Sequence, residues 1–92
     1  MIEREGGHLL LSGRLTMSTV PALYETGLQH LEAQDLQVDL AKVEAVDSAA
    51  VSMLLGWMRA AQKNGHNLRV VNIPAALMSL AHLYGVAEML PQ

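Results

Sequence analysis

The residue types best suited to chemistry stand together at the dipeptide Asp47-Ser48. Apolar residues before it recur with a spacing of two, whereas Val51, Leu54 and Leu55 after it recur with the spacing of a helix. This change of period predicts that a strand ends and a helix begins here. Both residues carry short side-chain oxygens that can cap a first helical turn. The Ser48 hydroxyl is therefore predicted at the positive end of a helix, where an anion or a partner protein can dock.

These residues do not match the pattern of a known kind of catalytic site. A Ser-His-Asp triad could be assembled on paper from Ser48, a histidine and Asp39 or Asp47, but the sequence has no oxyanion motif to support it. A Gly-rich phosphate loop is also missing, so the chain is not expected to hydrolyse nucleotide. The four histidines form no i, i+4 pair and there is no cysteine, so neither a metal nor a cofactor is expected. Asp47 is accordingly interpreted as a cap or turn residue.

Composition narrows the choice of partner. The chain has 92 residues, of which 51% are hydrophobic, and this predicts a single domain over residues 1–92. Its net charge of −3 argues against nucleic acid, and its six basic residues are too scattered to form a patch that binds membranes. No apolar run is long enough to cross a bilayer, and the first residues lack the features of a signal peptide. A cytoplasmic protein without direct membrane insertion is expected.

Hydrophobic periodicity predicts the elements that position the dipeptide. Strands are expected at 2–4, 8–14, 36–40 and 68–73, helices at 18–33, 49–63 and 74–84, and a last short strand or loose extension at 86–90. A hairpin followed by alternating helices and strands indicates an α/β fold. We therefore expect a four- or five-stranded mixed sheet with the helices mainly on one face.

Several local features refine this expectation. Consecutive leucines at 9–11 suggest a strand that is covered on both faces. Ser18 and Asn72 are candidate caps for the first and third helices, and Asn64-Gly65 is expected to end the second. Gly27 weakens its helix by about 1 kcal/mol relative to alanine, which suggests close packing there.

The spacing of apolar residues also predicts which side of each helix is buried. The second helix should bury Val51, Leu54, Leu55 and Met58. The third should bury Leu77, Leu80, Ala81 and Tyr84, and Trp57 is expected in the core or at its edge.

The segment Val46-Asp47-Ser48-Ala49-Ala50-Val51 resembles the signature of STAS domains, the fold shared by anti-sigma-factor antagonists and the cytoplasmic parts of sulphate transporters. In that family a strand ends in aspartate, a serine or threonine and two small residues follow, and a helix begins. The order of elements agrees over nearly the whole chain. The segments 80–91 and Ala22-Leu23-Tyr24-Glu25 further resemble the small STAS subunits of bacterial phospholipid transporters of the ABC class.

The resemblance implies a non-catalytic subunit that binds the ATPase of such a transporter, within a complex that includes a membrane permease and maintains outer-membrane lipid asymmetry. Such a subunit is cytoplasmic and peripheral to the inner membrane through its partner, with no small-molecule substrate. Carried over by position, Ser48 and Tyr24 lie in the ATPase contact, together with Asp47, Ala49 and Ala50. Tyr24 shares the apolar stripe of its helix and is equally compatible with a core position.

This sequence departs from those transporter subunits at the contact positions. It has serine where they have threonine at position 48, alanines where they have the following glycines, and tyrosine where they have tryptophan at position 24. Serine is equally common in the anti-sigma-factor antagonists, where it is phosphorylated. The alternative function is therefore an antagonist that is switched by phosphorylation of Ser48.

Overall fold

The computed structural model describes residues 2–90 and contains four strands and three α-helices. In chain order these are β1 (Ile2–Glu5), β2 (His8–Leu15), α1 (Val20–Ala33), β3 (Leu36–Val46), α2 (Ser48–Asn64), β4 (Leu68–Val71) and α3 (Ala75–Leu83), followed by a short 3-10 helix (Ala87–Met89). The predicted order is confirmed except at its end, where residues 86–90 do not form a strand. Met1, Pro91 and Gln92, which the predicted domain includes, lie outside the described residues.

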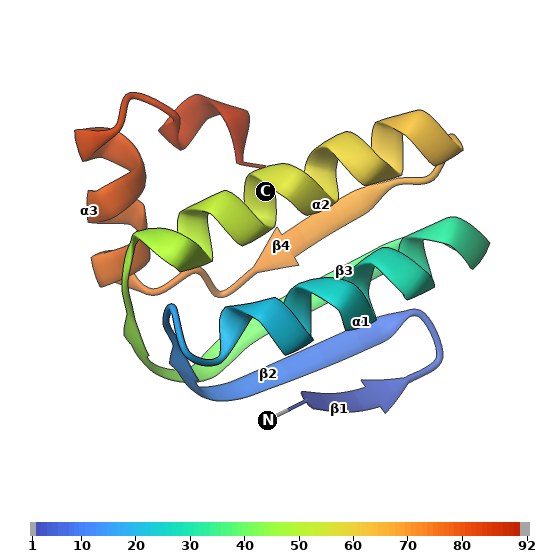
Figure 1. The fold of residues 1–92 in the computed structure, drawn as a ribbon, viewed down its shortest axis with the longest axis horizontal. Coiled ribbons are helices and arrows are strands. Elements are labelled where there is room, and N and C mark those ends of the chain that lie inside the picture. Colours follow the sequence, from blue (N-terminus) through green and yellow to red (C-terminus); the bar gives the residue numbers. More distant parts are fainter. Residues whose placement is uncertain (1, 91–92) are drawn as a thin grey trace.

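The strands form one mixed sheet in the order β1-β2-β3-β4. β1 pairs with β2 in antiparallel orientation, whereas β2 with β3 and β3 with β4 are parallel. Figure 1 shows α1 and α2 side by side across one face of this sheet, with α3 at its end beside the start of α2. The expected mixed sheet with helices mainly on one face is confirmed.

The opposite face of the sheet carries polar neighbours, and this corrects the expectation for β2. Leu9 and Leu11 are buried beneath the helices, but Leu10 points to the other face and is only half-buried. Its strand partners there are Glu3 and Asp39. The prediction that this strand is covered on both faces is wrong, because the neighbouring strands supply charged side chains on the outer face that a run of three leucines does not reveal.

Strand β3 is longer than its apolar pattern indicates, since it runs to Val46 and not to Leu40. Its pairing with β2 shifts register twice, once between Leu10 and Ser12 and again between Gly13 and Arg14. Each shift adds a residue to β3, so the alternation of inward and outward side chains is broken. The strand continues through these bulges and delivers the chain directly to the start of α2.

Two caps also differ from expectation. The cap of α1 is Thr19 and not Ser18, and the cap of α3 is Pro74 and not Asn72. Neither side chain accepts a hydrogen bond from the first-turn amides of its helix. The expected end of α2 is confirmed, because Gly65 closes it in the left-handed conformation with φ of 70°.

Helices α1 and α2 approach each other closely at Gly27. Trp57 of α2 is fully buried and its indole Nε1 donates to the carbonyl oxygen of Tyr24, at 3.0 Å. A Cβ atom at Gly27 would overlap the Trp57 ring. The close packing predicted at this glycine is confirmed, and so is the core position of Trp57.

The buried side of α2 is turned slightly from the predicted one. Its buried residues are Ala50, Val51, Met53, Leu54, Trp57 and Ala61. Val51 and Leu54 are therefore confirmed, whereas Leu55 and Met58 are half-buried.

In α3, Leu77 and Ala81 are buried as predicted, Leu80 is half-buried and Tyr84 is exposed over 52% of its surface. The prediction for Tyr84 is wrong because α3 ends at Leu83, so the helical period no longer determines where the tyrosine points.

Candidate functional site

The start of α2 is capped by Asp47. Its backbone is extended, and its Oδ1 atom accepts a hydrogen bond of 2.8 Å from the backbone amide of Ala49. Ser48 is already the first residue of the helix, and its side chain is exposed. Of the two residues that could cap this turn, Asp47 is therefore the cap and Ser48 is not, because the N-cap is the residue just before the first turn. This leaves the Ser48 hydroxyl free to face a partner.

The second oxygen of Asp47 holds the loop between β2 and α1 against this helix start. Oδ2 accepts from the backbone amide of Met17 at 3.0 Å, and the backbone amide of Asp47 donates to the carbonyl of Leu15 at 3.1 Å. One carboxylate thus joins two segments that are 30 residues apart in the sequence. Sequence reasoning missed Met17, although an apolar residue among Thr16, Ser18 and Thr19 was a usable signal.

The loop is also ordered from within. The Thr19 hydroxyl donates to the carbonyl of Arg14 at 2.7 Å and accepts from the backbone amide of Thr16 at 3.0 Å. The hydroxyls of Thr16 and Ser18 lie 3.1 Å apart, within hydrogen-bond distance. Thr19 is therefore occupied in shaping the loop rather than in capping the first turn of α1.

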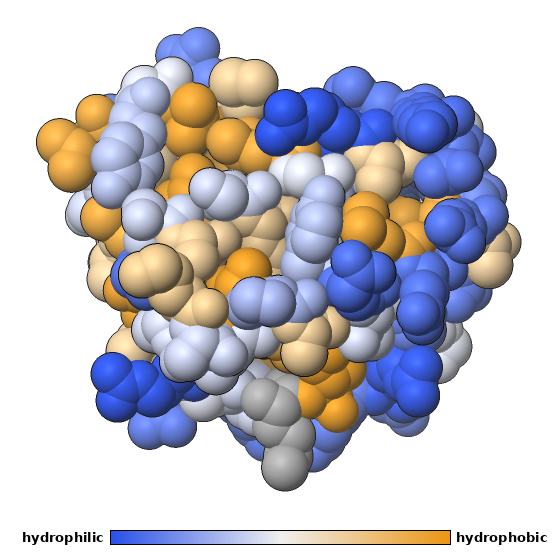
Figure 2. Space-filling view, in the orientation of Figure 1, coloured by the Kyte–Doolittle hydropathy of each residue, from blue (hydrophilic) through white to orange (hydrophobic). Residues whose placement is uncertain are grey.

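A shallow groove of about 350 Å³ opens on another side of Ser48. It is lined by Ser48, Val51, Ser52, Leu55, Tyr84 and Val86. One wall comes from α2 and the other from the chain that follows α3. Figure 2 shows apolar surface gathered on the side of α3, whereas the opposite side of this view is mostly hydrophilic. The groove could not be found from the sequence, since Tyr84 was assigned to the buried face of its helix and Val86 to a short strand or loose extension.

The two alanines after Ser48 have different positions. Ala49 is half-buried beside the cap, whereas Ala50 is fully buried in the core beneath α2. Small size at position 50 therefore lets the helix pack on the sheet. Ala50 is not on the surface, so the expectation that it faces a partner is corrected.

Tyr24 lies on the seam between the two long helices. It is half-buried, and its ring covers Gly56 of α2 so closely that a Cβ atom there would lie 2.7 Å from the tyrosine hydroxyl oxygen. Gly56 follows Ser48 by eight residues, about 12 Å along the helix axis. The structure thus places Tyr24 on the same layer of helices as Ser48, but outside the groove.

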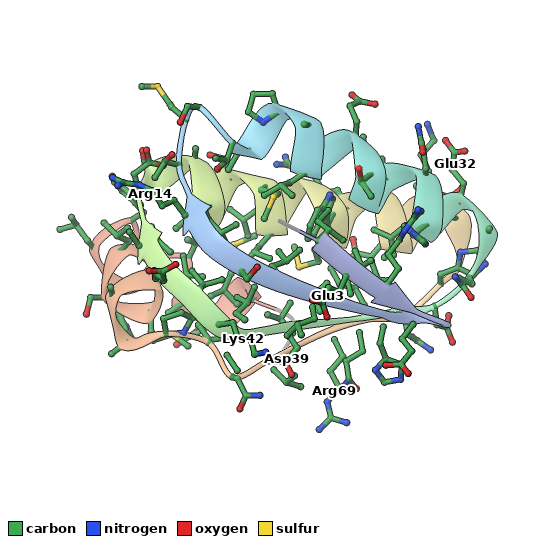
Figure 3. The ribbon with its side chains drawn as sticks, turned by 90° about the horizontal axis from the view of Figure 1, so that it is seen from below. Glu3, Arg14, Glu32, Asp39, Lys42 and Arg69 are labelled. Atoms are coloured by element: carbon green, nitrogen blue, oxygen red, sulfur yellow. The ribbon has the colours of Figure 1, made fainter. Side chains whose placement is uncertain are left out.

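The uncovered face of the sheet is a second, more polar surface. A hollow of about 860 Å³ lies there, lined by Glu3, Arg4, Glu5, His8, Leu9, Leu10, Gln37 and Asp39. Figure 3 shows Asp39, Lys42 and Arg69 on the side of the sheet turned away from α1. The side-chain amide of Asn72 donates a hydrogen bond of 3.0 Å to the Asp39 carboxylate. The backbone amide of Ala41 donates a second one, of 2.9 Å, to the same carboxylate. These two donors hold the pKa of Asp39 below its usual range.

Residues 2–90 contain no group of three side chains that could hold a metal ion. Among the same residues, no helix combines the length and the hydrophobicity needed to cross a bilayer.

A family model described as "Mlab, STAS domain" matches residues 1–91. The chain belongs to the STAS family. This STAS chain is 30% identical over 88 residues to the "Intermembrane phospholipid transport system binding protein MlaB" of Escherichia coli strain K12, a match that covers 95% of this chain and 90% of the relative. It is 26% identical over 82 residues to an "Anti-sigma-B factor antagonist" of Staphylococcus epidermidis, with 87% of this chain and 76% of the relative covered.

Solved structures show the same STAS fold. The unphosphorylated anti-sigma factor antagonist SpoIIAA superposes with a TM-score of 0.76 at 15% identity, covering 96% of this chain and 82% of the other. A chain of the Acinetobacter MlaFEDB complex in an ATP-bound conformation superposes with a TM-score of 0.74 at 24% identity, covering 91% and 90% of the two chains. The fold predicted from the STAS signature is therefore confirmed.

Proposed function

We propose that this STAS domain is a non-catalytic accessory subunit that binds and regulates the ATPase of an ABC-type phospholipid transport system. The ATPase would connect it to the membrane permease, so that the domain lies on the cytoplasmic side of the inner membrane. Such a system would maintain the lipid asymmetry of the outer membrane. Likeness to MlaB over 95% of the chain supports this assignment.

The observation that carries the proposal is the exposed Ser48 at the start of α2, with an apolar side chain on one side and an apolar groove on another. Met17 is exposed over 77% of its surface and is tied to Asp47, while Tyr84 lines the groove. A protein surface that combines exposed large apolar side chains with a shaped depression is typical of a protein–protein contact. Tyr24 extends this contact along the seam between α1 and α2.

The arrangement around Ser48 also supports the absence of chemistry. The side chain next to it in sequence, Asp47, already accepts hydrogen bonds with both of its oxygens. Among the described residues no hydrogen bond joins the Ser48 hydroxyl to a histidine or carboxylate that could act as a general base. Ser48 is accordingly assigned a role in contact and not in catalysis.

The test replaces Ser48 with glutamate and measures binding of the purified ATPase subunit. A carboxylate in the first turn of α2 suits the helix dipole, so the free domain should keep a melting temperature near that of wild type. The same carboxylate in an interface has no assigned partner and is costly to desolvate, so binding should weaken by about tenfold or more. Ser48→Ala should bind with little change.

Gln62→Glu is the matched control, since it adds the same charge to an exposed position at the other end of α2. We expect it to bind like wild type. If Ser48→Glu is stably folded and binds the ATPase at wild-type strength, the start of α2 is not the contact surface.

Exposure of Ser48 favours one alternative, an anti-sigma-factor antagonist that is switched by phosphorylation of this serine. A phosphate there would lie at the positive end of α2 and add negative charge to the contact surface. Incubation with the host's anti-sigma kinases and ATP, followed by mass spectrometry, tests this function. Phosphate on Ser48, together with kinase binding and no ATPase binding, would favour the antagonist over the transporter subunit.

A further inference from the structure

Met17 is the most exposed of the large apolar side chains that the structure describes, at 77%. It stands at the tip of the loop between β2 and α1, where its neighbours Thr16, Ser18 and Thr19 are all polar. A single exposed apolar side chain needs no explanation by itself. Met17 differs because hydrogen bonds fix the backbone of the loop that carries it.

Hydrogen bonds to three different acceptors hold the backbone of this loop. The amide of Met17 donates to Asp47, the amide of Thr16 donates to the Thr19 hydroxyl, and that hydroxyl donates to the carbonyl of Arg14. The polar side chains of the loop thus make hydrogen bonds within it, whereas its apolar side chain is exposed to solvent. A side chain presented from an ordered backbone loses less entropy when it enters a partner than one on a mobile loop.

The loop is also fixed in relation to the proposed contact. Asp47 binds Met17 with one oxygen and caps α2 with the other, so Met17 stands beside the helix start that exposes Ser48. The groove lined by Tyr84 and Val86 opens on another side of the same serine. Met17 and the groove therefore both border the exposed start of α2, and the surface that they form there with Ser48 is the proposed contact.

We propose that Met17 is the apolar anchor of this surface, and that its thioether enters an apolar pocket on the ATPase subunit. The inference rests on the proposed function and names the side chain that gives the contact its affinity. An unbranched thioether adapts to an irregular pocket, and the polar residues around it would form the rim that keeps water out. Asp47 acts as the positioning residue, because it aligns the anchor with α2.

This anchor is sensitive to oxidation. Hydrogen peroxide transfers one oxygen atom to the Met17 sulfur: the O–O bond breaks, an S–O bond forms, the sulfur loses two electrons and the peroxide is reduced to water. The product is a polar sulfoxide, which no longer suits an apolar pocket. The chain has no cysteine to compete for peroxide, and Met53 is protected because it is only 1% exposed.

The experiment measures the dissociation constant of the full chain and the purified ATPase subunit for four proteins. These are wild type, Met17→Leu, Met17→Gln and Met89→Gln, in which Met89 serves as a second exposed methionine, 50% exposed, outside the loop. Glutamine at position 17 should weaken binding by about tenfold or more, whereas leucine should keep it within about threefold. Met89→Gln should bind like wild type, and all free variants should melt like wild type because both side chains lie in solvent.

Peroxide gives a second readout. Binding by wild type should fall in step with sulfoxide at Met17, as mapped by mass spectrometry, and should return after treatment with methionine sulfoxide reductase. Met17→Leu should keep its binding under the same treatment. Wild-type affinity in Met17→Gln, or an equal loss in Met89→Gln, would overturn the anchor and leave the proposed function standing. Failure of the wild-type chain to bind the ATPase would overturn the proposed function itself.

Discussion

The division of roles between Asp47 and Ser48 makes a quantitative prediction about stability. Asp47→Ala removes the cap on the Ala49 amide, which costs about 1 kcal/mol, and the hydrogen bond from the Met17 amide, which costs about 1 kcal/mol at this exposed position. The free energy of unfolding should therefore fall by about 2 kcal/mol. For a domain of this size that loss lowers the melting temperature by about 8–16 °C. Ser48→Ala should change stability by no more than about 0.5 kcal/mol, since alanine is also a good helix former.

Urea unfolding followed by the fluorescence of Trp57 measures both variants, because this single tryptophan is fully buried and becomes exposed on unfolding. Asp47→Asn is the conservative control. Its amide keeps one acceptor oxygen but turns a donor toward the second amide, so it should lose about 1 kcal/mol. Equal losses in Ser48→Ala and Asp47→Ala would refute the reasoning, because they would show that the serine shares the capping role.

Two further predictions follow from the packing and the open face of the sheet. Gly27→Ala should destabilise the protein by about 1–3 kcal/mol despite the better helix propensity of alanine, because the new methyl group overlaps the Trp57 ring; a gain in urea midpoint would contradict this. The amides of Asn72 and Ala41 lower the pKa of Asp39, so its contribution to stability is present above about pH 4 and is lost as the pH falls through the lowered folded value. Asn72→Gly keeps the left-handed backbone but lacks the amide, so its urea midpoint should fall less than that of wild type between about pH 5 and pH 2.5; parallel curves would argue against this account.

Local patterns in the sequence determined the order of elements and located the candidate site. The change from a period of two to a helical period was enough to predict a helix start at Asp47 and Ser48. The predicted strand stopped at Leu40, and only the register of β3 with β2 shows that it continues to Val46. The roles of two glycines were predictable in the same way. Gly65 supplies the left-handed backbone that ends α2, and Gly27 leaves room for a neighbouring helix to pack closely. The STAS signature then added the fold.

Contacts between distant segments decided the rest. The bulges that lengthen β3 arise from its register with β2, and the cap at Asp47 is shared with a loop 30 residues away. Tyr84 carries an apolar spacing, yet it is exposed because α3 ends one residue before it and the chain turns toward α2. Periodicity reports which side of an element is apolar, because neighbouring residues in one element share one backbone geometry. It does not report which ends of different elements contact each other. The Met17 loop, the groove and the exposed Ser48 hydroxyl all depend on such contacts.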